Sequence, residues 1–154
     1  MKAATNQDLA LLNTGLVLHA LAKGVITKKD LHEILPHLMH LVTVQLQGRD
    51  LIRLAAEMTK NQTFLSYYQP KGLGFRGKIF GQIYNDGLVY HPESQTASLR
   101  GKTIAANQSY SLVTLDYWVF LPFFPTLEIA GKVTLYYPKL LREIYGEFLA
   151  RNEN

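Results

Sequence analysis

Residues 40–60 read HLVTVQLQGRDLIRLAAEMTK and contain the pattern that decides the fold. From His40 to Gln47 the side chains alternate between two faces, and the valines and threonine among them favour extended backbone. Gly48 then turns the chain. From Arg49 to Lys60 apolar residues recur every three or four positions, as they do along one face of a helix. The stretch therefore predicts a strand that leads directly into an amphipathic helix.

Upstream of this stretch, the sequence predicts a strand and a short helix. Leu9–Leu12 is an apolar run that ends in Asn-Thr-Gly, which is typical of a buried strand followed by a tight turn. Leu16–Lys23 predicts a short helix, and Gly24 is suited to close it.

A second helix is predicted between this segment and the central strand. Thr27 and Asp30 have the spacing of an N-cap residue and its reciprocal partner, and apolar residues at helical spacing follow them. Pro36 cannot continue a helix, so we expect this helix to end near Leu35.

The region after the long helix is dominated by β-strand patterns. Ile79–Tyr84 and Leu88–His91 flank Asn85-Asp86-Gly87, which predicts a β-hairpin. Ala97–Leu99 predicts a further short strand, and Tyr110–Trp118 predicts the clearest late strand.

The chain is expected to end in a helix. A loop rich in proline and aromatic residues precedes it, and Pro138 suits its first turn. An apolar stripe then runs from Leu140 to Leu149. Helices and strands are interleaved irregularly, so the predicted fold class is α+β, with a mixed β-sheet and packed helices.

Composition is that of one soluble globular domain spanning residues 1–154. The net charge is +4, but the basic residues are dispersed, which does not favour a nucleic-acid-binding arm. The absence of cysteine excludes disulfides and thiolate metal sites. Met1–Asp8 lacks the apolar run of a signal peptide. The longest apolar stretch, Tyr117–Pro125, is too short to span a membrane.

Several segments resemble, in order, the motifs of one known family. They are LALLNTG (9–15), KGVIT (23–27), DL (30–31), LPH (35–37), VQLQGRDL (44–51), RGKTI (100–104) and NQSYSLVTLDY (107–117). This ordered set is similar to the C-terminal domain of the 5'-nucleotidase and UDP-sugar hydrolase family. The similarity extends from about Leu9 to Leu149.

The resemblance implies a division of labour between two domains. In this family an N-terminal metallophosphoesterase domain holds two divalent metals, which polarise the phosphate and activate a water. None of that domain's motifs occurs in this chain. The chain is therefore expected to be inactive alone, to hold no cofactor itself, and to have as partners that catalytic domain and a nucleotide or related phosphoester.

The resemblance also implies a set of substrate-binding residues. Asn13 and Gly15 fall on the family's small-residue turn, where backbone amides approach the ligand. Phe75, with Arg76 beside it, falls near the first aromatic residue that stacks on the base, and Phe124 falls near the second. An aromatic pair accepts many bases, because every base has a π face.

Two departures from the family pattern weaken the inference about the ligand. Leu16-Val17-Leu18 stands where many members have Gly-Gly-Ile-Arg, so Leu18 replaces an arginine that faces the substrate. Phe120–Phe124 stands where members have a glycine-rich loop with an aspartate. The chain thus resembles a divergent bacterial branch, whose substrate is not fixed as a nucleoside monophosphate.

Two other motifs have competing interpretations. Gly72–Lys78 matches a P-loop up to the lysine, but Ile79 stands where serine or threonine would hold magnesium, so a flexible glycine loop is expected. His37 and His40 have a spacing that could bind a metal on a helix. Pro36 interrupts that helix, so surface or capping histidines are expected instead.

Three functional hypotheses follow. The first is a substrate-recognition domain of a bipartite metallophosphohydrolase. The second is a non-catalytic binding or interaction domain of the same fold, which the departures at Leu18 and Phe120–Phe124 motivate. The third is a nucleic-acid-binding module, but its second helix offers few side chains beyond Lys28 and Lys29 to read bases.

Overall fold

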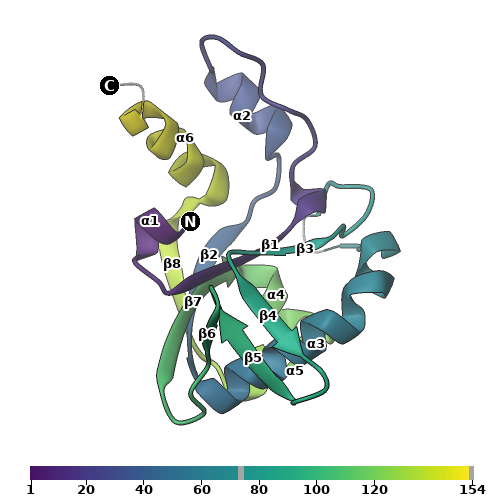
Figure 1. Ribbon diagram of the computed structural model, residues 1–154. Coiled ribbons are helices and arrows are strands. Elements are labelled where there is room, and N and C mark those ends of the chain that lie inside the picture. Colours follow the sequence, from purple (N-terminus) through teal and green to yellow (C-terminus); the bar gives the residue numbers. More distant parts are fainter. Residues whose placement is uncertain (73–74, 153–154) are drawn as a thin grey trace.

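The computed structural model describes residues 1–72 and 75–152, and for residues 137, 138 and 152 it describes the backbone alone. The described residues form an α+β fold with a mixed sheet (Figure 1). The helices are α1 (Lys2–Thr5), the 3-10 turn η1 (Thr14–Leu16), α2 (Lys28–Ile34), α3 (Gly48–Tyr67), α4 (Asp116–Phe120), α5 (Pro125–Ile129) and α6 (Leu141–Asn152). The strands are β1 (Leu9–Asn13), β2 (His40–Gln47), β3 (Ile83–Asn85), β4 (Leu88–His91), β5 (Thr96–Leu99), β6 (Lys102–Thr103), β7 (Ser109–Leu115) and β8 (Lys132–Leu140).

Two sheets share one long helix. Among the described residues, a five-stranded sheet has the order β3-β1-β7-β2-β8, and a three-stranded sheet has the order β4-β5-β6. β1 runs parallel to β7, while β2 is antiparallel to both β7 and β8. α3 contacts β2 and β7 of the larger sheet and β4 and β5 of the smaller one. The core therefore lies around α3, between the two sheets.

The predicted strand and helix at residues 40–60 are confirmed. β2 has the predicted bounds, and its Leu41, Val42 and Val44 are fully buried. α3 begins at Gly48 but continues seven residues beyond the predicted end, to Tyr67. It continues because Leu65, which is fully buried, extends the apolar face by two further turns.

The predicted cap of α2 is also confirmed. The Thr27 hydroxyl accepts a hydrogen bond from the Asp30 amide at 3.3 Å, and the Asp30 carboxylate accepts one from the Thr27 amide at 2.7 Å. The helix ends at Ile34, with Leu35 as its C-cap before Pro36.

The helix predicted for Leu16–Lys23 is wrong. After η1 the chain has no regular secondary structure until α2 begins. The amide of Leu18 donates to the carbonyl of Ile34 at 3.0 Å, which ties the segment to the end of α2 instead of to its own next turn. Tertiary contact thus overrides local helix propensity here.

The hairpin predicted around Asn85-Asp86-Gly87 is wrong, although the turn itself exists. β3 pairs with β1 in the larger sheet, whereas β4 pairs with β5 in the smaller one. The Asn85 side chain accepts hydrogen bonds from the amides of Gly87 at 2.9 Å and Leu88 at 2.6 Å. The Asp86 carboxylate accepts one from the amide of Ala10 in β1 at 2.8 Å. The turn therefore carries the chain from one sheet to the other.

Two predictions near the C-terminus need correction. The strand predicted for Tyr110–Trp118 ends at Leu115, and α4 begins at Asp116, whose carboxylate accepts the amide of Tyr117 at 2.8 Å. Pro138 lies in β8, and the last helix begins only at Leu141. β8 is an edge strand with a register shift opposite His40, a place where a proline removes no necessary hydrogen bond.

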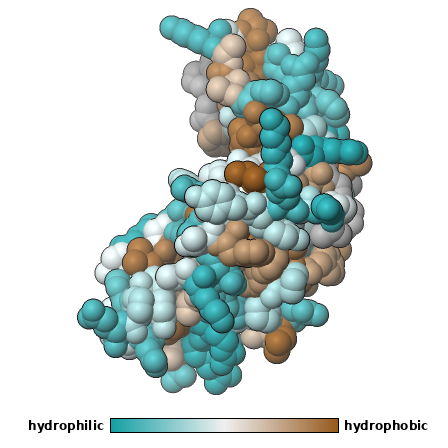
Figure 2. Space-filling model, turned by 90° about the vertical axis from the view of Figure 1, so that its right-hand side faces the viewer, coloured by the Kyte–Doolittle hydropathy of each residue, from teal (hydrophilic) through white to brown (hydrophobic). Residues whose placement is uncertain are grey.

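The molecule has an upper lobe and a lower body. α2 and α6 contact each other and stand above the larger sheet (Figure 1). In space-filling view the outline narrows to a waist between this lobe and the body (Figure 2). Within the described part of the chain, no helix combines the length and apolar character needed to cross a bilayer.

Candidate functional site

Residues 75–82, which we call the covering segment, lie over the end of β1 and η1. The amides of Thr14 and Gly15 donate to the carbonyls of Gln82 at 2.9 Å and Phe80 at 3.0 Å. The Thr14 hydroxyl in turn accepts the amide of Gln82 at 2.9 Å. These two backbone amides of the family turn are therefore already hydrogen-bonded within the protein and do not face a ligand.

Gly15 is required by this close approach of two backbones. A Cβ atom built at Gly15 would lie 1.9 Å from the carbonyl oxygen of Ile79 and 2.6 Å from that of Phe80. No side chain fits in that space. Gly15 thus fixes how closely the covering segment sits on the turn.

Asn13 holds the same region together from below. Its side chain is fully buried, and it donates to the carbonyl of Phe80 at 2.6 Å. Its side-chain oxygen accepts from the Trp118 indole at 3.2 Å and from the Tyr117 hydroxyl. Burial raises the pKa of Tyr117 far above its ordinary value, so the hydroxyl stays protonated and remains a donor.

Phe75 and Arg76 lie at the surface end of the covering segment. Phe75 is half-buried, and its ring stacks on the His37 ring with a centroid distance of 5.2 Å and an interplanar angle of 16°. The Arg76 side chain is exposed, while its amide donates to His37 Nδ1 at 3.0 Å. A half-buried aromatic ring and an exposed arginine side chain thus belong to adjacent residues of the covering segment.

His37 differs from its prediction as a surface or capping histidine. Its exposed fraction is 2%, and its Nε2 lies 3.1 Å from the carbonyl oxygen of Leu16. It is buried because the covering segment and η1 close over it from two sides. His37 directly follows Leu-Pro in the family motif, and this position is the sequence signal that could have identified it as part of the site.

The structure does not bring Phe124 next to Phe75. Phe124 is fully buried and stacks on Trp118, with centroids 4.6 Å apart and an interplanar angle of 8°. The rings of Phe80 and Tyr117 stand between the two: Phe75 is 6.5 Å from Tyr117, and Phe80 is 6.5 Å from Phe124. Contact of Phe124 with a base stays a prediction, and in this arrangement its ring supports the inner side of the cluster.

The glycine-rich motif of Gly72–Lys78 lies partly outside the described residues, because Leu73 and Gly74 fall there. From Phe75 onward the described chain contains no helix before β3, and the segment leads into a strand. A P-loop requires a helix at that point. The expectation of a loop joining a helix to a sheet is therefore confirmed for the described part.

Several grooves lie elsewhere on the surface. One, of about 800 Å³, is mainly apolar and lies between α1, η1 and α6. It is lined among others by Met1, Leu16, Val17, Tyr84 and Ile144. A smaller one, of about 310 Å³, lies between α3 and the β3–β4 turn and is more polar.

Metal chemistry is not supported by the side chains that the structure describes. Within residues 1–72 and 75–152, no three or more histidines, aspartates or glutamates gather closely enough to hold an ion. His40, one of the candidate ligands, is instead paired with Asp116, whose carboxylate lies 3.4 Å from its Nδ1.

Comparison with known proteins agrees with this architecture. Residues 1–121 match the family described as "5'-nucleotidase, C-terminal domain". The chain is 28% identical to an uncharacterized metallophosphoesterase of Bacillus subtilis, YunD, over 98% of the chain. It spans about a third of that protein, 34% of its length.

Solved structures show the same fold at low sequence identity. The NAD nucleotidase of Haemophilus influenzae superposes with a TM-score of 0.62 and 18% identity, over 95% of this chain and 27% of that protein. A 5'-nucleotidase precursor from Thermus thermophilus superposes with a TM-score of 0.58 and 18% identity, over 87% of this chain and 27% of that protein. With most of its length matched by the family, and with that family's fold, the chain belongs to the C-terminal domain family of 5'-nucleotidases.

Proposed function

We propose that this domain recognises a nucleotide or related phosphoester on behalf of a metallophosphoesterase domain, which carries out the hydrolysis. The observation that carries the proposal is the half-buried ring of Phe75 beside the exposed side chain of Arg76. An aromatic face can stack on a base, and a guanidinium group can bind phosphate oxygens with two parallel hydrogen bonds. Asn13 and Gly15 contribute by fixing the covering segment that carries both residues.

Phe124 has an indirect part in this proposal. Its stacking on Trp118, which donates to Asn13, keeps the inner side of the cluster rigid. Rigidity matters because a loop that is already ordered loses less entropy when it binds a ligand. Phe124 would thus act on affinity through packing beneath the covering segment.

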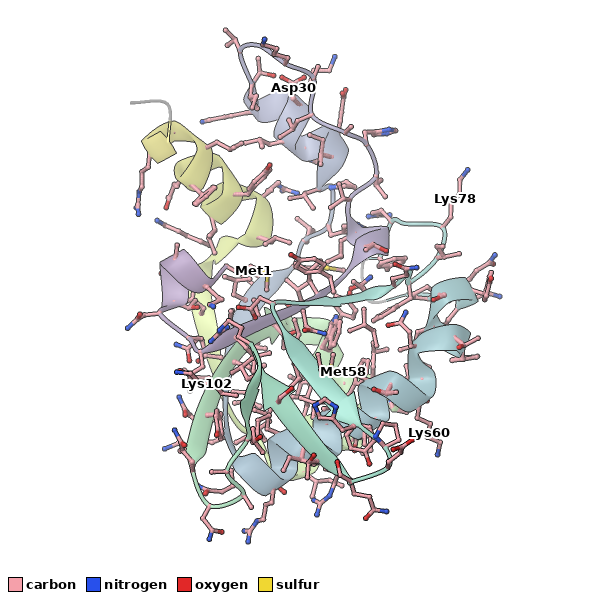
Figure 3. The ribbon with its side chains drawn as sticks, viewed as in Figure 1. Met1, Asp30, Met58, Lys60, Lys78 and Lys102 are labelled. Atoms are coloured by element: carbon pink, nitrogen blue, oxygen red, sulfur yellow. The ribbon has the colours of Figure 1, made fainter. Side chains whose placement is uncertain are left out.

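Calorimetric titration with a nucleoside monophosphate tests the proposal. Replacing the ring in Phe75→Leu and the charge in Arg76→Gln should each weaken binding about tenfold, because each removes one contact of roughly 1–3 kcal/mol. Lys78→Gln is the matched control, since Lys78 projects outward from the same segment (Figure 3). An equal loss in Lys78→Gln would indicate unspecific attraction of an anion and would count against a defined site.

Activity of the isolated chain provides a second check. Incubated with nucleotides and divalent metal, this chain should release no phosphate above background. Robust turnover that survives substitution of Phe75 and Phe124 would contradict the division of labour between the two domains.

An interaction domain of the same fold is the second candidate function. The aromatic loop favours it, because Phe120 is 71% exposed and Ile129 is 81% exposed on neighbouring short helices. If this alternative is right, the chain binds no nucleotide. It instead self-associates, which sedimentation detects, and Phe120→Ser and Ile129→Ser abolish this self-association. A saturable nucleotide signal would decide against it.

A further inference from the structure

The hydrogen bonds of His37 define its protonation state. A backbone amide can only donate, so Nδ1, which lies 3.0 Å from the Arg76 nitrogen, must carry a lone pair. Nε2 faces the carbonyl oxygen of Leu16 at 3.1 Å and must therefore carry the hydrogen. This arrangement requires the neutral imidazole with its proton on Nε2.

The same ring holds two adjacent residues of the candidate site. Its face stacks on Phe75, and its edge fixes the backbone of Arg76. At the other edge, the bond to Leu16 anchors the ring to η1, which is part of the rigid turn below. His37 therefore connects the well-ordered interior with the surface end of the covering segment.

We propose that His37 is the positioning residue of the nucleotide site, and that its neutral form holds Phe75 and Arg76 in the geometry that binds the ligand. The proposal rests on the proposed function, because it assigns His37 a role toward the residues that would touch the nucleotide. His37 itself contacts no ligand in this scheme.

Protonation should release this arrangement. An imidazolium ion has two N–H donors and no lone pair, so Nδ1–H would face the Arg76 amide hydrogen. Charged residues also contact the neighbours of His37 in the chain. Arg142 of α6 donates to the Pro36 carbonyl at 3.3 Å, Asp116 of α4 is paired with His40, and Arg76 of the covering segment carries the amide bonded to the ring. Tyr117, whose ring centroid lies 6.5 Å from that of Phe75, stays neutral because burial raises its pKa. Acidification is thus expected to loosen residues 75–76 and weaken nucleotide binding.

Two substitutions separate the functions of the ring edges. In His37→Asn, the amide oxygen can replace Nδ1 as the acceptor for Arg76 without titrating. In His37→Gln, the longer side chain can reach the Leu16 carbonyl in place of Nε2 but leaves the Arg76 amide without its acceptor. His91→Asn is the control, because His91 is exposed and bonded to Ser98 in the smaller sheet.

Affinity for a nucleoside monophosphate should be measured for these variants at a series of pH values from neutral to acidic. His37→Asn cannot titrate at this position, so any loss of its affinity at low pH reports the titration of the phosphate itself. The wild type should lose about tenfold more affinity than this variant as the imidazole is protonated. His37→Gln should bind about tenfold more weakly at every pH. Equal behaviour of the Asn and Gln variants would show that the ring has only a structural role and would overturn the proposal.

A ligand-free measurement keeps the inference separate from the proposed function. Long-range ¹⁵N–¹H spectra of the wild type should show protonated Nε2 and unprotonated Nδ1 at neutral pH. The Arg76 amide signal should shift with the same midpoint as the ring. A proton on Nδ1, or an Arg76 amide signal that does not shift while the ring titrates, would overturn the positioning role. If the two signals titrate together while no nucleotide binds at any pH, the proposed function fails and the positioning of residues 75–76 by His37 stands.

Discussion

At the scale of single residues, the packing around Gly15 leaves no room for a side chain. Gly15 lies against the carbonyl groups of Ile79 and Phe80 in the covering segment, and the Phe80 carbonyl is held by hydrogen bonds from the Gly15 amide and the Asn13 side chain. A methyl group in this place has no flexible neighbour to displace. The identity of this residue is therefore dictated by packing, whether or not a ligand is present.

We predict that Gly15→Ala lowers the free energy of unfolding by about 1–3 kcal/mol, the usual cost of overpacking a fixed interior site. Denaturant unfolding followed by circular dichroism measures this directly. Gly146→Ala is the matched control, because the Cβ there would meet only the end of the flexible Leu31 side chain, and alanine favours a helix. Equal midpoints for the two variants would contradict the role assigned to Gly15.

The candidate site shows what residue types alone can predict. Asn13 and Gly15 were identified from the family turn, but their neighbours in the covering segment are more than sixty residues away in sequence. Burial of Phe124 depends on Trp118 and Phe80, and a local pattern of aromatic residues cannot distinguish a stacked interior ring from an exposed one. The local sequence likewise predicts a surface position for His37, because the residues that contact its ring edges are 21 and 39 positions away.

At the scale of secondary-structure elements, the turn between β3 and β4 joins the two sheets through one carboxylate. Burial opposes ionisation of Asp86, but hydrogen bonds from Lys2 and the Ala10 amide, with the charges of Lys2 and Arg100, outweigh it and lower its pKa. Lys2 lies 2.5 Å and Arg100 2.9 Å from the carboxylate. Asp86 thus ties α1, β1 and the β5–β6 turn together.

We predict that Asp86→Asn destabilises the protein by about 0.5–1 kcal/mol at pH 7, a value reduced by solvent screening of partly exposed charges. A carboxyl group with a lowered folded-state pKa stabilises the fold above its ordinary pKa of 3.8, and this contribution disappears as the pH falls through the lower folded value. The difference from the wild type should therefore vanish at acidic pH. Thermal unfolding at several pH values measures it, with the exposed Glu93→Gln as control. A difference independent of pH would refute the ionic origin.

Elements with local signals could be predicted from the sequence, and elements that depend on distant partners could not. β2 and the cap of α2 follow from alternation and from a pair of residues three positions apart, and both are confirmed. Asn85-Asp86-Gly87 correctly indicated a turn, but no local signal says which strand each arm joins. Leu16–Lys23 had helical composition, yet the end of α2 determines its path.

At the scale of the whole molecule, stability is distributed unevenly between body and lobe. β2 lies between β7 and β8, with fully buried residues along its length. α2 and α6 contact each other above the sheet, and much of their surface is exposed (Figure 1). Regions with few buried contacts open before the core does.

We predict that amides of β2 and β7 exchange with solvent most slowly and that those of α2 and α6 exchange through local opening at lower free energy. Hydrogen exchange followed by NMR measures both. Ile144→Ala, which removes a buried side chain from α6, should cost about 2–4 kcal/mol and accelerate exchange in α2 and α6 more than in β2. Equal protection of the lobe and the central strands would contradict this division.

The parallel pairing of β1 with β7 has a consequence for how the polypeptide is made. Leu9 lies opposite Leu112, so the first strand has to remain unpaired on that side until about a hundred further residues have left the ribosome. At elongation speeds of roughly 5–20 residues per second, this wait lasts about 5–20 seconds. During that interval an apolar strand with open edges is the natural target of chaperones that shield nascent chains.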